Sequence, residues 1–294
     1  MYAMLAYPLA HFAVFWIGVN FNSILLAFQV FNSGTTSFNF LPAAQSFSNF
    51  AKFAKDLFTN NLLKTGAKNS GILFLVGLLF STPVNITLAY FIYKKVPMWK
   101  FFRDILFLTS IISSIVWVLI FKYFFEYGIP IIAKKLGYEL PVLLIYPTTA
   151  FPLMILYGLW TGFGGGLLLY VNAMVKIPDS LTEYGRIEGM NARQEIRYLI
   201  LPFIYPLLTT FLVVSVADFF LVQGPLFAFY DHSAPSFTYT IGYFMFTQVF
   251  RKDASNMSGY PYIASGGLLF TAIAAPVTLL VKWALEKFGP DVKY

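Results

Sequence analysis

The sequence contains no cysteine and few charged residues of either sign. The absence of cysteine excludes disulfide bonds, thiolate nucleophiles and cysteine-ligated metals. Asp, Glu, Lys and Arg together make up 11% of the 294 residues, whereas 58% are hydrophobic. An ordinary soluble domain has about 25% charged residues. The composition therefore indicates a protein that is largely surrounded by lipid.

Catalytic and nucleotide-binding patterns are also missing. No segment matches the phosphate-binding pattern G-x-x-x-x-G-K-[ST], so we expect that the chain does not itself bind ATP. The two histidines, His11 and His232, lie far apart, and no pair of carboxylates falls within one apolar run. Acid–base catalysis needs such groups in pairs. We therefore expect no catalytic residue, metal or cofactor in this chain. The net charge of +7 forms no basic stripe, which argues against nucleic-acid binding.

What the sequence does contain is long apolar runs. A helix needs about 20 residues to cross the hydrocarbon core. Six runs reach that length, and they predict an all-α polytopic membrane protein with residues 1–294 forming a single transmembrane domain. The expected spans are approximately 4–31, 67–93, 102–127, 141–175, 199–226 and 262–285.

Positive charge predicts the orientation of these spans. Cytoplasmic loops carry an excess of Lys and Arg. The tight connection after the second run contains four such residues, and the loop at 176–198 contains another four. An even number of spans puts both termini on one side, so we expect both in the cytoplasm. The four residues of the tight connection are Lys94, Lys95, Lys100 and Arg103.

The segment at 47–57 is amphipathic, with its apolar residues at helical spacing. It predicts a short helix. That helix either lies flat on the outer membrane surface or serves as an ordinary packed connector.

The most informative segment is the polar loop at approximately 177–198. Ser180 and Glu183 have the spacing of a capping box, which predicts a helix start at Ser180. Gly189 can adopt the left-handed conformation that ends a helix. A second helix is expected to begin near Asn191. The loop is therefore predicted to contain a short, self-capped helix, although a simple connection would need only a few flexible residues.

This loop resembles the signature E-A-A, two or three residues, D-G-A, eight residues, I-x-L-P of binding-protein-dependent ABC importer permeases. Glu183 takes its first position, Gly189 its glycine, and Leu199, Leu201 and Pro202 its closing residues. The double alanine is replaced by Tyr-Gly, the aspartate by Glu and the third alanine by Met. In that family the helix docks on an ATPase subunit. The resemblance assigns the coupling role to Ser180, Glu183, Arg186, Gly189, Arg193, Leu201 and Pro202.

Landmarks in the other spans resemble the maltose-type, carbohydrate-uptake branch, among them Trp160-x-Gly162 followed by Ile177-Pro178. The resemblance implies a type I ABC importer permease fold in a bacterial or archaeal inner membrane. The implied partners are a second homologous permease, two ABC ATPase subunits that hold ATP and Mg, and an extracytoplasmic solute-binding protein. The implied cargo is a carbohydrate.

Counting from these landmarks gives the positions that line the sugar site in this branch. Asp218 is the only carboxylate well inside an expected span, and a charge there is costly enough that a functional role is the default interpretation. A packing role against the partner permease is the alternative. The glycines favour either a roomy cavity or close helix approach. The substrate-lining candidates are Ser110, Ser114, Gly158, Thr161, Gly162, Gly165, Ser215, Asp218 and Phe219.

Two other functions stay open on the sequence alone. The same machine could import glycerol phosphate, a polyamine or an oxyanion, although polyanions sit poorly beside Asp218 and a polyamine site should hold more acidic groups. A channel or a non-transporting membrane scaffold is the other class, but it would not need the motif that runs from Glu183 to Pro202.

Overall fold

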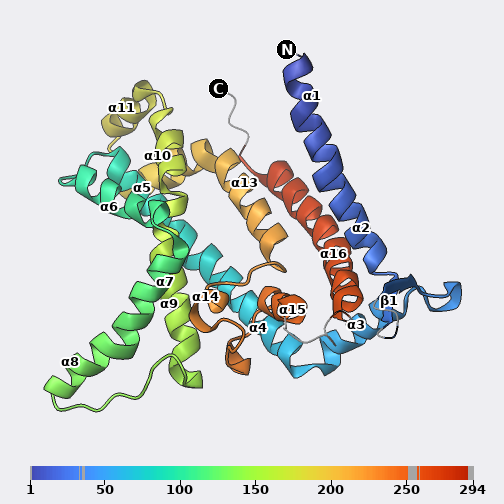
Figure 1. The fold of residues 1–294 in the computed structure, drawn as a ribbon. Helices are drawn as coiled ribbons and strands as arrows, with labels where there is room; N and C mark the ends of the chain where they lie inside the picture. The colour runs from blue at the N-terminus through green and yellow to red at the C-terminus, as the bar shows by residue number, and fades with distance from the viewer. Residues whose placement is uncertain (1, 33, 35–36, 251–256, 258, 291–294) are drawn as a thin grey trace.

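The computed structural model describes residues 2–32, 34, 37–250, 257 and 259–290. Within these residues, six helices are long and apolar enough to cross a membrane. The chain is thus a polytopic, almost entirely helical membrane protein, as predicted (Figure 1). The six spans are Ala6–Leu26, Asn61–Tyr93, Ser114–Lys135, Pro147–Val175, Ala192–Asp218 and Gly259–Phe288.

Most spans consist of more than one helical segment. The first contains α1 (Tyr2–His11), η1 (Phe12–Ile17) and α2 (Gly18–Leu26), and the second contains α4 (Asn61–Val76), η3 (Gly77–Ser81) and α5 (Thr82–Tyr93). The third contains α7 (Ser114–Tyr123), η4 (Phe124–Gly128) and α8 (Ile129–Lys135), and the fourth contains α9 (Pro147–Gly165) and α10 (Leu167–Val175). The fifth contains α12 (Ala192–Glu195), η5 (Ile196–Ile200) and α13 (Leu201–Asp218), and the sixth is α16 (Gly259–Phe288).

Three of the wide, π-helical turns have a common cause. η3, η4 and η5 each end two residues before a proline, namely Pro83, Pro130 and Pro202. A proline ring clashes with the carbonyl four residues earlier and donates no hydrogen bond. That carbonyl lies inside the π turn in each case. Widening the turn accommodates the ring while the helix continues.

The apolar run at 102–127 does not form one span. α6 (Trp99–Ile111) ends where the backbone becomes extended at Ile112 and Ser113, and α7 starts a new helix. α6 packs on α9, where a Cβ at Gly164 would collide with the carbonyl oxygen of Leu106. Gly164 therefore serves close helix approach, which is one of the two readings of the glycine-rich stretch.

The first apolar run also differs from expectation, because its helix ends at Leu26 and not near residue 31. The chain continues into a hairpin of β1 (Gln29–Asn32) and β2 (Ser37–Phe40), antiparallel with Gln29 opposite Phe40. This hairpin is an addition to the all-α prediction. The Asn49 side chain donates to the carbonyls of Ala27 and Gln29, both at 2.9 Å, and so fixes the chain where it leaves the span.

The predicted amphipathic helix at 47–57 is present as α3 (Ser48–Thr59), after a single turn η2 (Ala43–Gln45). Its apolar side packs on α16, and Phe53 is fully buried. The absence of a side chain at Gly266 makes room for the Phe53 ring, which would otherwise collide with a Cβ. α3 is therefore a packed connector.

The chain between the fifth and sixth spans folds back over α4. It contains α14 (Leu226–Tyr230), η6 (Ser236–Thr238) and α15 (Ile241–Phe250). Asn69 is 4% exposed, and its side-chain amide donates to the carbonyls of Phe237 at 2.8 Å and Tyr239 at 2.9 Å. These bonds satisfy two irregular backbone groups and hold the returning segment against the span.

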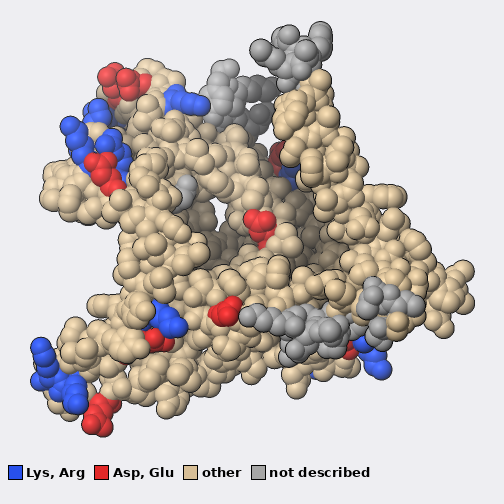
Figure 2. Space-filling view, in the orientation of Figure 1, with Lys and Arg blue, Asp and Glu red and all other residues tan. Residues whose placement is uncertain are grey.

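The connections between the spans lie at two opposite ends of the molecule (Figure 1). The start of α1, the end of α16 and the loop helix α11 (Asp179–Ile187) lie at one end, whereas α3, the hairpin and α8 lie at the other. Charged side chains gather over α11 and the neighbouring ends of α5 and α6, and at the end of α8 (Figure 2). On the face in view, the surface between these two ends carries only a few charged side chains, as expected for a membrane-embedded belt.

We expect Asn69→Ala to lower the free energy of unfolding by about 2 kcal/mol, because two hydrogen bonds are lost and two carbonyls are left without donors. The thermal unfolding midpoint of the purified protein should fall by about 4–8 °C. Asn61→Ala, an exposed position on the same helix, is the control. Equal shifts for the two variants would contradict the clamping role of Asn69.

Candidate functional site

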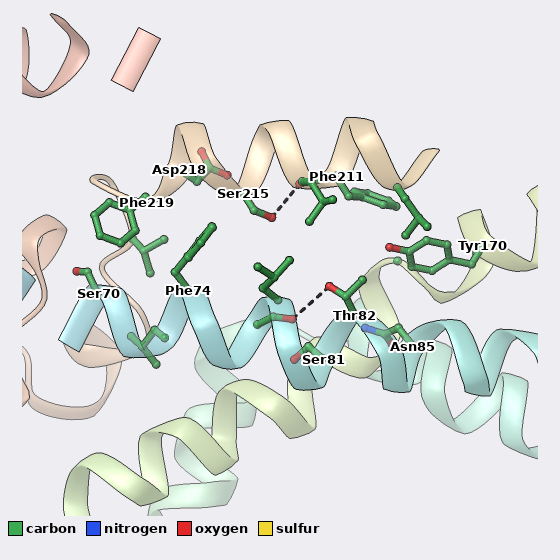
Figure 3. A pocket seen from close by; sticks show the side chains of 17 residues that line it. Ser70, Phe74, Ser81, Thr82, Asn85, Tyr170, Phe211, Ser215, Asp218 and Phe219 are labelled. Atoms are coloured by element: carbon green, nitrogen blue, oxygen red, sulfur yellow. Dashed lines mark hydrogen bonds between the residues drawn. The ribbon is translucent and has the colours of Figure 1, made fainter. Parts of the chain in front are cut away.

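A cavity of about 380 Å³ lies between the second and fifth spans. α4, η3 and α5 form one wall, α13 forms the opposite wall, and Tyr170 of α10 closes one end (Figure 3). Small-molecule sites measure roughly 300–1,000 Å³. The lining residues are Ser70, Leu73, Phe74, Gly77, Leu78, Ser81, Thr82, Asn85, Gly166, Tyr170, Leu208, Phe211, Leu212, Ser215, Asp218, Phe219 and Val222.

The polar groups of this cavity differ in how far the protein satisfies them. Ser215 Oγ donates to the carbonyl of Phe211 at 2.8 Å, and Thr82 Oγ1 donates to that of Gly77 at 3.2 Å. Both hydroxyl oxygens keep lone pairs for a ligand. The Asn85 amide nitrogen donates to the Gly162 carbonyl at 3.2 Å, but its buried Oδ1 has no partner among the described residues. Asn85 is 7% exposed, so this acceptor is costly to leave unpaired.

Aromatic rings supply the apolar part of the lining. Phe74 and Phe219 face each other across the cavity edge-to-face, with 5.7 Å between their ring centroids. At the other end, the rings of Tyr170 and Phe211 are tilted by 57° to each other, with 5.3 Å between their centroids. The cavity thus offers hydroxyls, an amide oxygen and one carboxylate between flat apolar surfaces. Its lining, within the described residues, includes no Lys, Arg or His.

The sequence-based candidates fall into two groups. Ser215, Asp218 and Phe219 line the cavity, and Gly162 touches its wall through the bond from Asn85. The others lie outside the lining. Thr161 donates to the Tyr157 carbonyl at 2.9 Å, and the Ser114 carbonyl accepts from the Tyr157 hydroxyl at 3.3 Å. The Ser110 hydroxyl donates to the Phe107 carbonyl at the end of α6. Gly158 is exposed on α9, and Gly165 is the last residue of that helix.

Sequence reasoning missed the wall that the second span provides, including Ser81, Thr82 and Asn85. One signal was available. Asn85 is an amide well inside a long apolar run, and an amide at membrane depth needs a partner.

The polar loop forms α11 followed by the start of the fifth span. The predicted capping box at Ser180 and Glu183 is wrong, because α11 begins one residue earlier and Pro178 occupies the cap position without a side-chain hydrogen bond. Proline is tolerated at a helix start because that backbone position needs no donor. A capping box forms in the next helix instead. The backbone amide of Gln194 donates to Asn191 Oδ1, and the backbone amide of Asn191 donates to Gln194 Oε1, both at 2.9 Å.

Gly189 ends α11 as predicted, with φ +74°. Its amide donates to the Arg186 carbonyl at 3.1 Å, and the Met190 amide donates to the Gly185 carbonyl at 2.9 Å. This pair of bonds is the Schellman arrangement, which requires a left-handed residue and therefore favours glycine. Arg186, like Ser180, Glu183 and Arg193, is exposed on the loop surface.

Glu195 ties the loop to the second span. Its carboxylate forms an ion pair with Lys94 and accepts from the Tyr90 hydroxyl at 2.8 Å. The side chains of Lys94 and Glu195 are only 19% and 14% exposed. Leu201 and Pro202 follow as half-buried residues at the start of α13, and Leu201 packs against the core formed by α5, α10 and α13.

Six spans, a polar cavity and an ordered loop on one end are the features of a membrane-embedded transport component. A family model described as binding-protein-dependent transport system inner membrane component matches residues 81–294. The match covers more than half of the chain, and the chain belongs to this family.

Curated relatives agree with this family. The chain is 24% identical over 201 residues to the multiple sugar-binding transport system permease protein MsmF of Streptococcus mutans, an alignment that covers 68% of each protein. It is 24% identical over 204 residues to the arabinooligosaccharides transport system permease protein AraP of Bacillus subtilis, covering 67% of this chain and 64% of AraP.

The fold matches that of a bacterial ABC transporter involved in the import of the acidic polysaccharide alginate. The TM-score is 0.78 at 20% identity, covering 98% of this chain and 95% of that one. A second structure, the alginate transporter in complex with an alginate pentasaccharide-bound periplasmic protein, gives a TM-score of 0.76 at 20% identity, covering 96% and 92%.

Proposed function

We propose that this permease imports a neutral carbohydrate through the cavity between the second and fifth spans. The composition of the cavity is the observation that supports this most. Hydroxyl, amide and carboxylate oxygens suit sugar hydroxyls, and the rings of Phe74 and Phe219 suit the apolar face of a pyranose. The names of MsmF and AraP, which refer to sugar and arabinooligosaccharide transport, support the same class of cargo.

Other cargoes fit this lining less well. A glycerol phosphate or oxyanion would place negative charge beside Asp218, with no Lys, Arg or His among the described lining residues to offset it. A polyamine would need more than the single carboxylate that the cavity offers. A channel or scaffold would have no use for the capped loop helix.

In the proposed mechanism, α11 docks on one of two ABC ATPase subunits, which hold ATP and Mg, and a second homologous permease completes the translocation pathway. An extracytoplasmic solute-binding protein delivers the sugar. The ATPase pair closes on ATP, and the movement of α11 turns the cavity outward; hydrolysis returns it inward. ATP acts here as a ligand that shifts the population of two states.

Asp218→Leu should reduce uptake by roughly 100-fold or more, because two charge-assisted hydrogen bonds to sugar hydroxyls are lost. Asp218→Asn keeps the shape and one acceptor, and its effect should be much smaller. Uptake of labelled sugar is measured in proteoliposomes that contain the complete transporter, at matched protein levels. Parental uptake by Asp218→Leu would contradict the substrate role, and a loss of complex yield would identify Asp218 as a packing residue.

Gly189→Pro should uncouple ATP hydrolysis from uptake. Proline cannot adopt the φ of +74°, and it removes the amide that donates to Arg186. Gly189→Asn is the matched control, since Asn tolerates the left-handed conformation. Binding-protein-stimulated ATPase activity and uptake are measured together. Normal stimulation and uptake in the proline variant would argue against the coupling role of α11.

The proposed orientation puts both termini and α11 in the cytoplasm. A cysteine at Asn191 should then react only with a reagent supplied from the cytoplasmic side, and one at Ser236 only from outside. Both positions are exposed, and the chain has no native cysteine that would react. Reversed labelling would overturn the orientation and with it the contact of α11 with a cytoplasmic ATPase.

A further inference from the structure

An apolar pocket of about 190 Å³ lies between the end of α5 and the start of α6, away from the transport cavity. α5 ends the second span at Tyr93, so the pocket lies near the level where hydrocarbon meets the lipid headgroups. An apolar cavity of about 150 Å³ stays dry and takes up apolar molecules. Its walls are Leu88, Phe91, Ile92, Val96, Pro97, Trp99, Phe102 and Leu106.

Positive charge borders this pocket. Lys100 Nζ lies 5.7 Å from the centroid of the Trp99 ring, and Arg103 Cζ lies 5.3 Å from it. Lys95 directly precedes Val96, a wall residue, and is exposed. The cations therefore lie along one edge of the apolar pocket. Trp99 stands at this edge, because it lines the pocket and also contacts Lys100 and Arg103.

The four cations of this connection differ in their pairing. Lys94 is bound to Glu195, and Arg103 is bound to its neighbour Asp104, with Nε–Oδ1 2.9 Å and Nη2–Oδ1 2.8 Å. Within the part of the chain that the structure describes, Lys95 and Lys100 pair with no carboxylate. Two positive charges beside an apolar pocket are thus left without a carboxylate partner among the described residues.

We propose that this pocket binds an anionic glycerophospholipid of the cytoplasmic leaflet, with an acyl chain between α5 and α6 and the phosphate at Lys95 and Lys100. Basic pockets between transmembrane helices on the cytoplasmic side suit anionic headgroups, because the lysines supply the charge and the helices supply the apolar wall. The assignment of the lipid to the cytoplasmic leaflet rests on the orientation proposed above. The binding of the lipid does not depend on that orientation, so the cysteine labelling and the lipid measurement can fail independently.

The site is tested by native mass spectrometry of the purified complete transporter, taken from nanodiscs of equal parts phosphatidylglycerol and phosphatidylcholine. The parent protein should retain phosphatidylglycerol in preference to phosphatidylcholine. The double variant Lys95→Gln/Lys100→Gln should weaken that preference by about 30-fold, since each lysine near the surface contributes about one factor of five. Val96→Phe fills the pocket without changing charge and should also release the lipid.

The matched control is Lys134→Gln/Lys135→Gln, which removes two exposed lysines at the other end of the molecule and should leave the preference unchanged. Equal retention of both lipids by the parent would overturn the proposal, as would equal effects of the two double variants. If Lys95→Gln/Lys100→Gln lowers the yield of bound ATPase while the lipid preference persists, the surface is a protein interface and the proposal is wrong.

Discussion

The absence of water in the bilayer core is the constraint on which the structure depends. Every backbone amide and carbonyl there must be satisfied by the protein, and a helix does this within one segment. Where the helices deviate, the structure supplies a substitute. The turns before Pro83, Pro130 and Pro202 widen without ending the helix, and Asn69 donates to the carbonyls of the irregular segment that returns over α4.

The same constraint shapes the cavity. A hydroxyl at membrane depth is costly to leave unpaired, and in the cavity lining Ser215 and Thr82 donate to carbonyls in the preceding turn of their own helix. Such bonds leave acceptor lone pairs directed into the space between the spans. Asn85 differs from these two residues, because its amide nitrogen donates to the neighbouring helix and its oxygen is buried with no partner among the described residues. A bound hydroxyl would remove that cost.

The lengths of the apolar runs predicted the number of spans. The left-handed conformation that a helix end requires predicted that Gly189 ends α11. Hydropathy did not locate the break at Ile112 and Ser113, because the apolar residues on both sides of it keep the average over the whole run high. The capping box predicted at Ser180 does not form, because the cap position of α11 is Pro178, two residues earlier, and proline also suits a helix start. The second-span wall of the cavity was missed because most of the run at 67–93 is apolar, and only a few scattered polar residues such as Asn85 mark the face that lines the cavity.

One chain of contacts joins the loop to the cavity. The capping box at Asn191 and the bonds around Gly189 make α11 and the start of the fifth span locally rigid. Glu195 then attaches this unit to Lys94 and Tyr90 at the end of α5. Asn85 and Thr82 lie on the same helix and line the cavity. A displacement of α11 is therefore applied to both walls at once, through α13 on one side and α5 on the other. Under the proposed function, this double attachment lets a movement at the ATPase contact change the width of a cavity that α11 never touches.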